Sequence, residues 1–174
     1  NYGVPQSRKR FTLVANRVTE DKLEPIELQD KVLTVRDVLG VENGFPKIPA
    51  GHQDGSDYMH SCAGLSEINL QRLKLIPKDG GNRSAFADRP DLQLKCFIGK
   101  DDSFKDTFGR LWWDRPAPTI TTKFFSISNG RFVHPEEDRA LSLREGATLQ
   151  SFPKTYVFKA NSRDKIARLI GNAV

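Results

Sequence analysis

A short row of polar and basic residues that leads directly into an apolar run constrains the fold of this chain most. Gln6, Arg8 and Arg10 occupy every second position, and the apolar run covers residues 11–15. Alternate side chains of an extended backbone share one face, so the amide and both guanidinium groups would point the same way. Guanidinium groups only donate hydrogen bonds, which suits phosphate oxygens or the carbonyl edge of a base. The pattern predicts a strand over residues 11–15 that holds this row rigidly, although a solvated strand edge has the same spacing.

Three later segments accompany this row in a characteristic order. They are Arg115-Pro116-Ala117-Pro118-Thr119-Ile120-Thr121, the run Arg-Glu-x-Ala-x-Leu-Gln-x-Phe-Pro over residues 144–153, and Gly171-Asn172-Ala173-Val174. Together with Gln-x-Arg-x-Arg, this order resembles the C-terminal half of a DNA cytosine-5 methyltransferase. Each motif alone carries little specificity, but their joint order and spacing are highly specific, and the resemblance covers nearly the whole chain. One departure is Thr148, where the usual family form has an arginine.

The resemblance implies an α+β fold with a domain organisation in three segments. Residues 1–25 would end the catalytic domain, residues 26–138 would form a target recognition domain of short strands and helices, and residues 139–174 would return to the catalytic domain. The two flanking segments would be the terminal pieces of an incomplete Rossmann-like α/β methyltransferase domain, truncated before its final helix.

Local patterns predict the elements within these segments. Capping residues and terminating glycines predict helices over residues 34–40, 66–75, 142–152 and 162–170, the last of them ended by Gly171. Ser142 and Glu145 have the spacing of a capping box. Apolar alternation predicts strands over residues 92–98 and 120–125, with Cys96 buried in the first of them.

The composition is compatible with a DNA-binding protein of the cytoplasm. The net charge of +5 and the pI of about 9.3 favour a polyanionic partner. The two cysteines, Cys62 and Cys96, are far apart in sequence, which argues against a disulfide framework and suits a reducing compartment. The sequence contains no apolar run that approaches the roughly 18 residues of a membrane span. We therefore expect a cytoplasmic protein of a prokaryote.

The catalytic cysteine of the family has no counterpart in this sequence. Methyltransferases of this family carry, upstream, a glycine-rich turn for S-adenosylmethionine and a Pro-Cys pair whose thiolate attacks the base. Neither Cys62 nor Cys96 follows a proline. We therefore expect a fragment or one subunit of the enzyme, inactive alone, whose partners are double-stranded DNA and the missing N-terminal catalytic half.

The resemblance also assigns roles to the motif residues. The target cytosine leaves the base stack for a pocket, where Arg10 would hold the base carbonyl, Arg8 would lie near the pocket and the DNA backbone, and Gln6 would order the turn. Asn172, Ala173 and Val174 would lie against the methionine part of the cofactor, S-adenosylmethionine, most of whose pocket would belong to the missing N-terminal part.

Two glycine-bearing segments, residues 79–83 and 119–131, are candidates for the loops that contact DNA. Glycine lets a backbone approach DNA closely, and polar side chains beside it can reach bases or phosphates. The candidate contacts are Asn82, Arg83, Thr119, Thr121, Lys123, Asn129 and Arg131. Thr119 is the best supported, because the resemblance places this threonine beside the flipped base, whereas ordinary surface turns would explain the others equally well.

Three other interpretations remain open. The chain could be the DNA-recognition subunit of a split methyltransferase, or a non-catalytic DNA-binding remnant with the salt dependence of phosphate contacts. A metal site built from His60, Cys62 and Cys96 is the third, although their spacing matches no usual zinc pattern. The bases recognised are not encoded in any motif.

Overall fold

The structure is a computed structural model that describes residues 2–11, 13, 15, 17, 18, 28–100 and 103–173. Its α-helices are α1 (Val35–Val38), α2 (Glu67–Leu75), α3 (Leu143–Leu149) and α4 (Arg163–Asn172). Its 3₁₀ turns are η1 (Val41–Asn43), η2 (Arg83–Phe86) and η3 (Lys95–Phe97), and its strands are β1 (Gln6–Ser7) and β2 (Ala117–Pro118). Among the described residues, no helix is long and apolar enough to cross a membrane.

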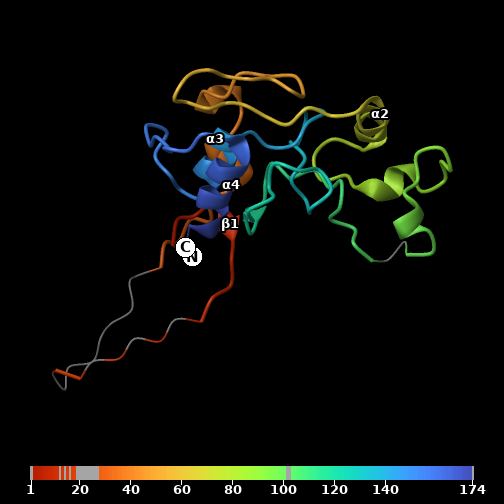
Figure 1. Cartoon of the computed structure of the whole chain (residues 1–174). Coiled ribbons are helices and arrows are strands. Elements are labelled where there is room, and N and C mark those ends of the chain that lie inside the picture. Colours follow the sequence, from red (N-terminus) through yellow and green to blue (C-terminus); the bar gives the residue numbers. More distant parts are fainter. Residues whose placement is uncertain are drawn as a thin grey trace.

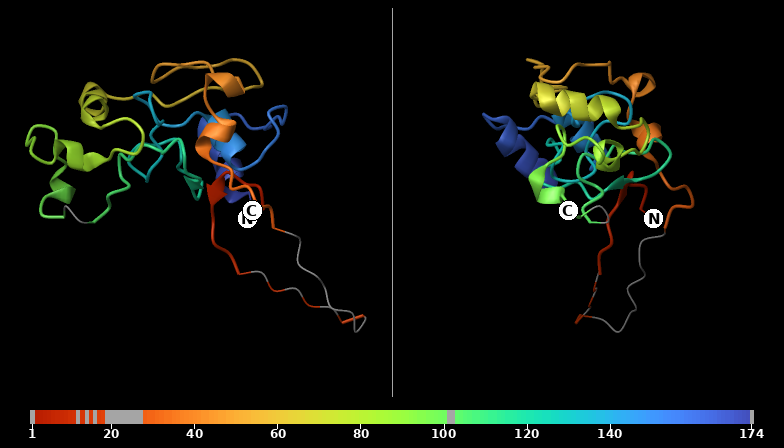
Figure 2. Two further views of the ribbon diagram at one scale, coloured as in Figure 1. Left: turned by 180° about the vertical axis from the view of Figure 1, so that it is seen from behind. Right: turned by 90° about the vertical axis from the view of Figure 1, so that its right-hand side faces the viewer.

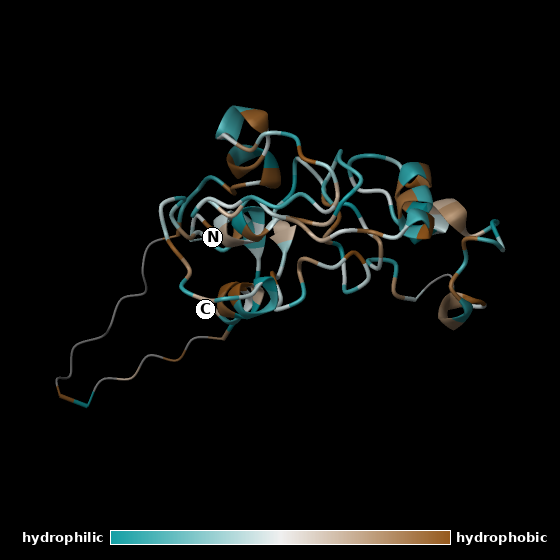
Figure 3. Ribbon diagram, turned by 45° about the horizontal axis from the view of Figure 1, so that its top comes forward, coloured by the Kyte–Doolittle hydropathy of each residue, from teal (hydrophilic) through white to brown (hydrophobic). Residues whose placement is uncertain are grey.

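The described residues form two hydrophobic clusters that lie side by side. Helices α3 and α4 lie with β1 in one part of the molecule, and α2 lies in the other (Figures 1 and 2). The larger cluster gathers apolar residues of α1, β2, α3 and α4, and the smaller one gathers those around α2 and η2. The helical ribbons carry both hydrophilic and hydrophobic residues, as helices that cover a core on one side do (Figure 3).

A narrow extended ladder joins the two clusters. Phe132 and Leu141 belong to the larger cluster, whereas their chain neighbours Val133 and Ala140 belong to the smaller one. The backbone amide of Leu141 donates to the carbonyl of Phe132 at 3.0 Å. Because successive side chains of an extended backbone point to opposite faces, one ladder supplies both cores.

Strand β1 pairs in parallel with β2, which joins the first motif of the sequence to the second. Gln6 pairs with Ala117 and Ser7 with Pro118, and the amide of Ala117 donates to the carbonyl of Pro5 at 2.9 Å. Beyond Ser7, the predicted strand over residues 11–15 is wrong where the structure describes it. Phe11 and Leu13 lie outside any strand and are 89% and 78% exposed. A strand needs a hydrogen-bonded neighbour, and no described segment pairs with these residues; Thr12 and Val14 lie outside the described residues.

The strands predicted over residues 92–98 and 120–125 are also wrong. The first segment instead contains η3, and Cys96 within it is exposed rather than buried. The amide of Phe97 donates to the carbonyl of Leu94 at 2.8 Å, and in the second segment Phe124 donates to Thr121 at 3.3 Å. These local bonds close turns and replace a strand ladder, so the alternating apolar pattern reflects turns that pack side chains against a core.

The four predicted helices are confirmed, with differences at their ends. The capping box of α3 is present: the amide of Glu145 donates to Ser142 Oγ at 3.1 Å, and the amide of Ser142 donates to Glu145 Oε2 at 2.7 Å. Helix α4 does not end at Gly171 but continues through Asn172. A Cβ on Gly171 would collide with the backbone of Thr121 and Thr122, so the glycine lets α4 pack directly on that turn.

Buried charges stabilise the larger cluster around Arg139. This guanidinium group, which is 0% exposed, donates two hydrogen bonds to Glu145, at 2.7 and 2.8 Å. It donates two more to Glu137, both at 3.1 Å. Burial alone would raise the pKa of the Glu145 carboxyl, but the charge and hydrogen bonds of Arg139 lower it to about 2.

We expect Glu145→Gln to destabilise the fold strongly. The change leaves Arg139 buried with only Glu137 as a charged partner, which costs about 3 kcal/mol of unfolding free energy. Urea unfolding measures the loss. The matched control is Asp114→Asn, which breaks an exposed ion pair with Arg36 and should cost no more than about 1 kcal/mol. Equal losses in the two variants would contradict a special role for the buried pair.

The same pair should make stability sensitive to acid. The pKa of Glu145 is lowered in the fold from 4.5 to about 2. The stability that its ionised form contributes is therefore complete above pH 4.5 and is lost as the pH falls to about 2. Unfolding free energies measured across that range should fall more steeply for the unmodified chain than for Glu145→Gln. Parallel profiles would show that Glu145 is not ionised in the fold.

Candidate functional site

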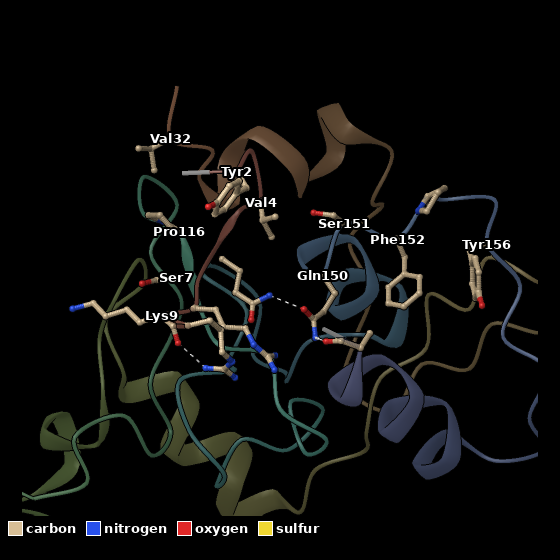
Figure 4. A pocket seen from close by; sticks show the side chains of 15 residues that line it. Tyr2, Val4, Ser7, Lys9, Val32, Pro116, Gln150, Ser151, Phe152 and Tyr156 are labelled. Carbon is tan, nitrogen blue, oxygen red and sulfur yellow. Dashed lines mark hydrogen bonds between the residues drawn. The ribbon is translucent and has the colours of Figure 1, made fainter. Parts of the chain in front are cut away.

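A cavity of about 1040 Å³ brings the separated sequence motifs together. It lies between the residues of β1, the turn that precedes β2, the end of α3 and the residue that follows α4 (Figure 4). Its lining residues are Tyr2, Val4, Gln6, Ser7, Arg8, Lys9, Arg10, Val32, Pro116, Gln150, Ser151, Phe152, Pro153, Tyr156 and Ala173. Residues more than 160 positions apart in the chain thus face one space.

Two side-chain amides link these motifs. Gln6 Oε1 accepts a hydrogen bond from the backbone amide of Ile120 at 2.9 Å. Gln6 Nε2 donates to Gln150 Oε1 at 2.7 Å, a bond drawn in Figure 4. Gln150 Nε2 then donates to the carbonyls of Ile170 and Ala173, at 2.9 and 3.3 Å. One chain of hydrogen bonds therefore runs from β1 through the end of α3 to the end of α4. Within it, Gln6 connects β1 to the segment that follows β2.

The arginines of the first motif provide donors at this cavity. Arg8 is half-buried, and its Nε is buried without a hydrogen-bond partner among the described residues. Arg10 is exposed, and its Nη1 donates to the carbonyl of Lys9 at 2.8 Å. Ser7 and Lys9 also line the cavity. Alternate positions of an extended row would place these two side chains on the face opposite Arg8 and Arg10, so the expected alternation is not kept. The reason is that β1 ends at Ser7 and strict alternation ends with it.

Thr119 lies beside the first motif. Its Oγ1 donates to the carbonyl of Ser7 at 3.1 Å, directly after the β1–β2 pair. Thr121 is exposed, and its Oγ1 accepts from the amide of Lys123 at 3.3 Å. Lys123 is exposed and reaches Asp164 at 3.4 Å. The exposed Asn129 donates to Ser126 Oγ at 2.8 Å.

Arg83 and Arg131, two of the predicted DNA contacts, are buried. Arg83 is 4% exposed, and it donates to the carbonyls of Lys100 and Ser103, both at 2.5 Å. Arg131 is 5% exposed and donates to the carbonyl of Gly80 at 2.8 Å. Their positions differ from the exposed position that direct contact with DNA requires, because each guanidinium group is occupied by loop carbonyls. Asn82 is half-buried, and its Oδ1 accepts from the amide of Ser84 at 2.9 Å at the start of η2.

The three residues of the terminal motif are placed differently. Ala173 lines the cavity, and its carbonyl accepts from Gln150. Asn172 is exposed in the last turn of α4. Val174 lies outside the described residues.

Neither cysteine lines the cavity. Cys62 is buried, its Sγ donates to the carbonyl of Pro49 at 3.2 Å, and burial raises the pKa of its thiol. His60 Nε2 lies 2.9 Å from the carbonyl of Pro46, and Nδ1 lies 2.9 Å from Ser142 Oγ. In the part of the chain that the structure describes, no three His, Cys, Asp or Glu side chains are placed to hold a metal ion.

Sequence reasoning missed the aromatic part of the cavity and the role of Gln150. The rings of Phe152 and Tyr156 lie 5.0 Å apart, with their planes tilted by 56°, at one end of the cavity, and Tyr2 lies at the other (Figure 4). Gln150 belongs to the Leu-Gln-x-Phe-Pro motif, and that membership is the signal that could have identified it. No local pattern marks Tyr2 or Tyr156.

We expect Gln6 to be the residue whose amide joins the motifs. Gln6→Ala leaves the amide of the fully buried Ile120 without its acceptor, which costs roughly 1–3 kcal/mol. Gln6→Glu keeps that acceptor but sets a carboxylate oxygen against Gln150 Oε1, with no proton between the two acceptors, so it should also destabilise the fold. Gln53→Ala, which removes an exposed amide bonded only to Gly51, should change stability by less than about 0.5 kcal/mol. Thermal and urea unfolding measure the order of the three; an unchanged Gln6→Ala variant would rule out the linking role.

Comparisons with known proteins show which proteins this chain is similar to. A family model for C-5 cytosine-specific DNA methylase matches residues 1–174. Type II methylase M.HgiDII of Herpetosiphon aurantiacus is 40% identical over 180 residues, which cover 100% of this chain and 49% of that protein.

Two further relatives extend the likeness to other organisms. Type II methyltransferase M1.BsuMI of Bacillus subtilis (strain 168) is 30% identical over 172 residues, covering 99% of this chain and 38% of that protein. DNA (cytosine-5)-methyltransferase 3 of Arabidopsis thaliana is 35% identical over 164 residues, covering 82% of this chain and 12% of that protein. The chain thus spans about half the length of M.HgiDII and a smaller share of the other two. On its match to the family model over residues 1–174, this chain belongs to the C-5 cytosine-specific DNA methylase family.

Proposed function

We propose that this chain supplies the DNA-recognition and base-positioning part of a DNA cytosine-5 methyltransferase. The observation that carries the proposal is the amide chain from Gln6 through Gln150 to Ala173, which holds the family motifs around one cavity. That cavity has two guanidinium groups, of Arg8 and Arg10, at its wall. Among the described residues, neither group has a carboxylate partner, so both charges are available to a ligand.

The reaction requires a base that has left the DNA stack, because a nucleophile approaches C6 from the face of the ring, which neighbouring bases cover within a duplex. A thiolate adds to C6 of the ring, which makes C5 nucleophilic toward the methyl group of S-adenosylmethionine. Negative charge then develops at the base oxygen and ring nitrogen, and donors already aimed there stabilise it. In this proposal Arg10 donates to the base carbonyl, and Arg8 lies between the pocket and the DNA backbone.

The proposal places the nucleophilic thiolate outside these 174 residues. Cys62 is buried with a raised pKa, Cys96 is exposed on η3, and neither lines the cavity. S-adenosylmethionine supplies the methyl group. Ala173 is the described residue of the terminal motif that lines the cavity, where it would contact the cofactor. Most of the cofactor pocket would then lie in the catalytic part that completes the enzyme.

Residues 26–138 act in this proposal as the target recognition domain. Exposed Thr121, Lys123 and Asn129 are available to DNA, and Thr119 contacts the first motif. Buried Arg83 and Arg131 shape the loops that approach DNA rather than touching it themselves. A bacterial cytoplasm suits this function and two free thiols.

A chimera with a relative tests the proposal. The N-terminal part of M.HgiDII that precedes its match would be joined to this chain, and transfer of a labelled methyl group to DNA would be measured. The chain alone should bind DNA and transfer nothing, whereas the chimera should methylate cytosine. Methyl transfer by the chain alone would overturn the assignment of the nucleophile. A folded chimera that binds DNA without transfer would favour a non-catalytic remnant.

We expect Arg10→Ala in the active chimera to lower kcat by ~10²-fold or more, the effect of losing one positioned donor to a developing charge. Arg10→Lys keeps the charge and loses the forked geometry of the guanidinium group, so its kcat should lie between that of the unmodified chimera and that of Arg10→Ala. The control is Arg168→Ala, an exposed cation of α4 that does not line the cavity. Single-turnover rates at saturating DNA separate the chemical step from binding, and an unchanged rate in Arg10→Ala would remove Arg10 from the pocket.

A further inference from the structure

Two arginines contact the indole ring of Trp112. The guanidinium carbon of Arg131 lies 3.9 Å from the ring centroid, and that of Arg115 lies 4.5 Å from it. Arg131 is buried, Trp112 is half-buried and Arg115 is exposed. The ring of Trp112 therefore lies between the interior and the surface of the molecule, with the inner contact made by buried Arg131 and the outer contact by exposed Arg115.

The inner contact is held rigidly. Arg131 donates to the carbonyls of Gly80 and Arg110, both at 2.8 Å, and its Nε lies 2.8 Å from an oxygen of Asp106. Gly80 lies against the indole: a Cβ at this position would collide with the ring of Trp112. The loop of residues 79–83 and the indole are thus fixed to each other, and the indole provides a firm platform for Arg115.

The charge of Arg115 has no partner among the described residues. A second arginine–tryptophan pair nearby shows the contrast. Arg36 lies 5.4 Å from the centroid of Trp113, but it also forms a forked ion pair with Asp114, at 2.6 and 3.1 Å. Arg115 has the ring contact without the carboxylate, so among the described residues its N–H donors remain available to a ligand.

Arg115 also lies next to the candidate site. Its chain neighbour Pro116 lines the cavity, opposite the aromatic end formed by Phe152 and Tyr156 (Figure 4). The carbonyl of Arg115 accepts from the amide of Val35 at 3.0 Å, which ties its backbone to the start of α1. The backbone of this uncompensated cation is therefore one residue away from the wall of the cavity that also carries Arg10.

We propose that Arg115 binds a phosphate of the DNA strand beside the extruded base, with Trp112 and Arg131 as positioning residues that hold it there. The inference rests on the proposed function, since it assumes DNA at this cavity. A guanidinium group stacked by its face can still donate two in-plane hydrogen bonds to one phosphate. Phosphate contacts fix the register of a protein on the duplex, so Arg115 would help to align the cavity with its target.

The salt dependence of DNA binding tests the role of Arg115. Dissociation constants of the chain for a DNA duplex would be measured between about 0.05 and 0.3 M salt. Arg115→Gln should lower the slope of log K against log salt by about one and weaken binding roughly five- to tenfold at 0.1 M salt, the effect of one lost phosphate contact. Arg115→Lys should keep the slope.

Two further variants separate contact from positioning. Arg36→Gln, the matched control, removes an arginine that Asp114 already neutralises and should leave the slope unchanged. Trp112→Leu keeps the cation and removes its platform, so binding should weaken with an unchanged slope, and Trp112→Phe should restore most of the affinity. The melting temperature of every variant would be measured as well. If the contacts of Trp112 only stabilise the fold, the variants should change the melting temperature and leave DNA binding unchanged.

The outcomes distinguish the inference from the proposed function. If the unmodified chain binds DNA weakly and without salt dependence, the proposed function fails and the inference fails with it. If the unmodified chain binds with a steep slope that Arg115→Gln leaves intact, the proposed function stands and only the phosphate contact is overturned. A reduced slope in Arg115→Gln but not in Arg36→Gln supports the contact.

Discussion

The chain of hydrogen bonds made by the side-chain amides of Gln6 and Gln150 is the interaction on which the arrangement of the site depends. An amide both donates and accepts, so each glutamine can pass the connection onward. Gln6 uses its oxygen for the amide of Ile120 and its nitrogen for Gln150, and Gln150 uses its nitrogen for the carbonyls at the end of α4. Without this chain, the two-residue pairing of β1 with β2 would be a weak tether for the arginines that follow it.

A second set of interactions makes that arrangement rigid. Arg139 and Glu145 are fully buried and neutralise each other beside the capping box of α3, which fixes the helix that presents Gln150. Arg110, also fully buried, donates to carbonyls of Leu73 and His134 and so ties α2 to the ladder between the two clusters. Buried arginines thus replace part of the regular sheet structure that a larger domain would use to hold its loops, because each guanidinium group can satisfy several carbonyls at once.

The burial of Arg83 and Arg131 changes how the two segments over residues 79–83 and 119–131 are understood. Both residues lie in segments that the sequence marks as DNA-contacting loops, yet their guanidinium groups are occupied by backbone carbonyls. Arg115 is an exposed cation that contacts the same ring as Arg131, and the sequence offers it only as part of a motif with prolines. Composition cannot distinguish a cation that organises a loop from one that meets a ligand, since the difference lies in whether its donors are already satisfied. Local patterns are likewise a poor guide to burial: the alternating pattern predicted Cys96 to be buried in a strand, but it is exposed.

The order of the motifs and the capped helices were determined by the sequence itself. Caps and helical spacing act within a few residues, so α1 to α4 and the Ser142–Glu145 capping box could be predicted locally. The strands over residues 11–15, 92–98 and 120–125 could not, because a strand exists only where another segment pairs with it. Tertiary structure alone decided that Gln6 meets Gln150 across 144 positions, that α4 passes Gly171 to pack on Thr121, and that Arg131 lies over the ring of Trp112. Each of these contacts joins residues that are distant along the chain, and no local pattern records such a distance.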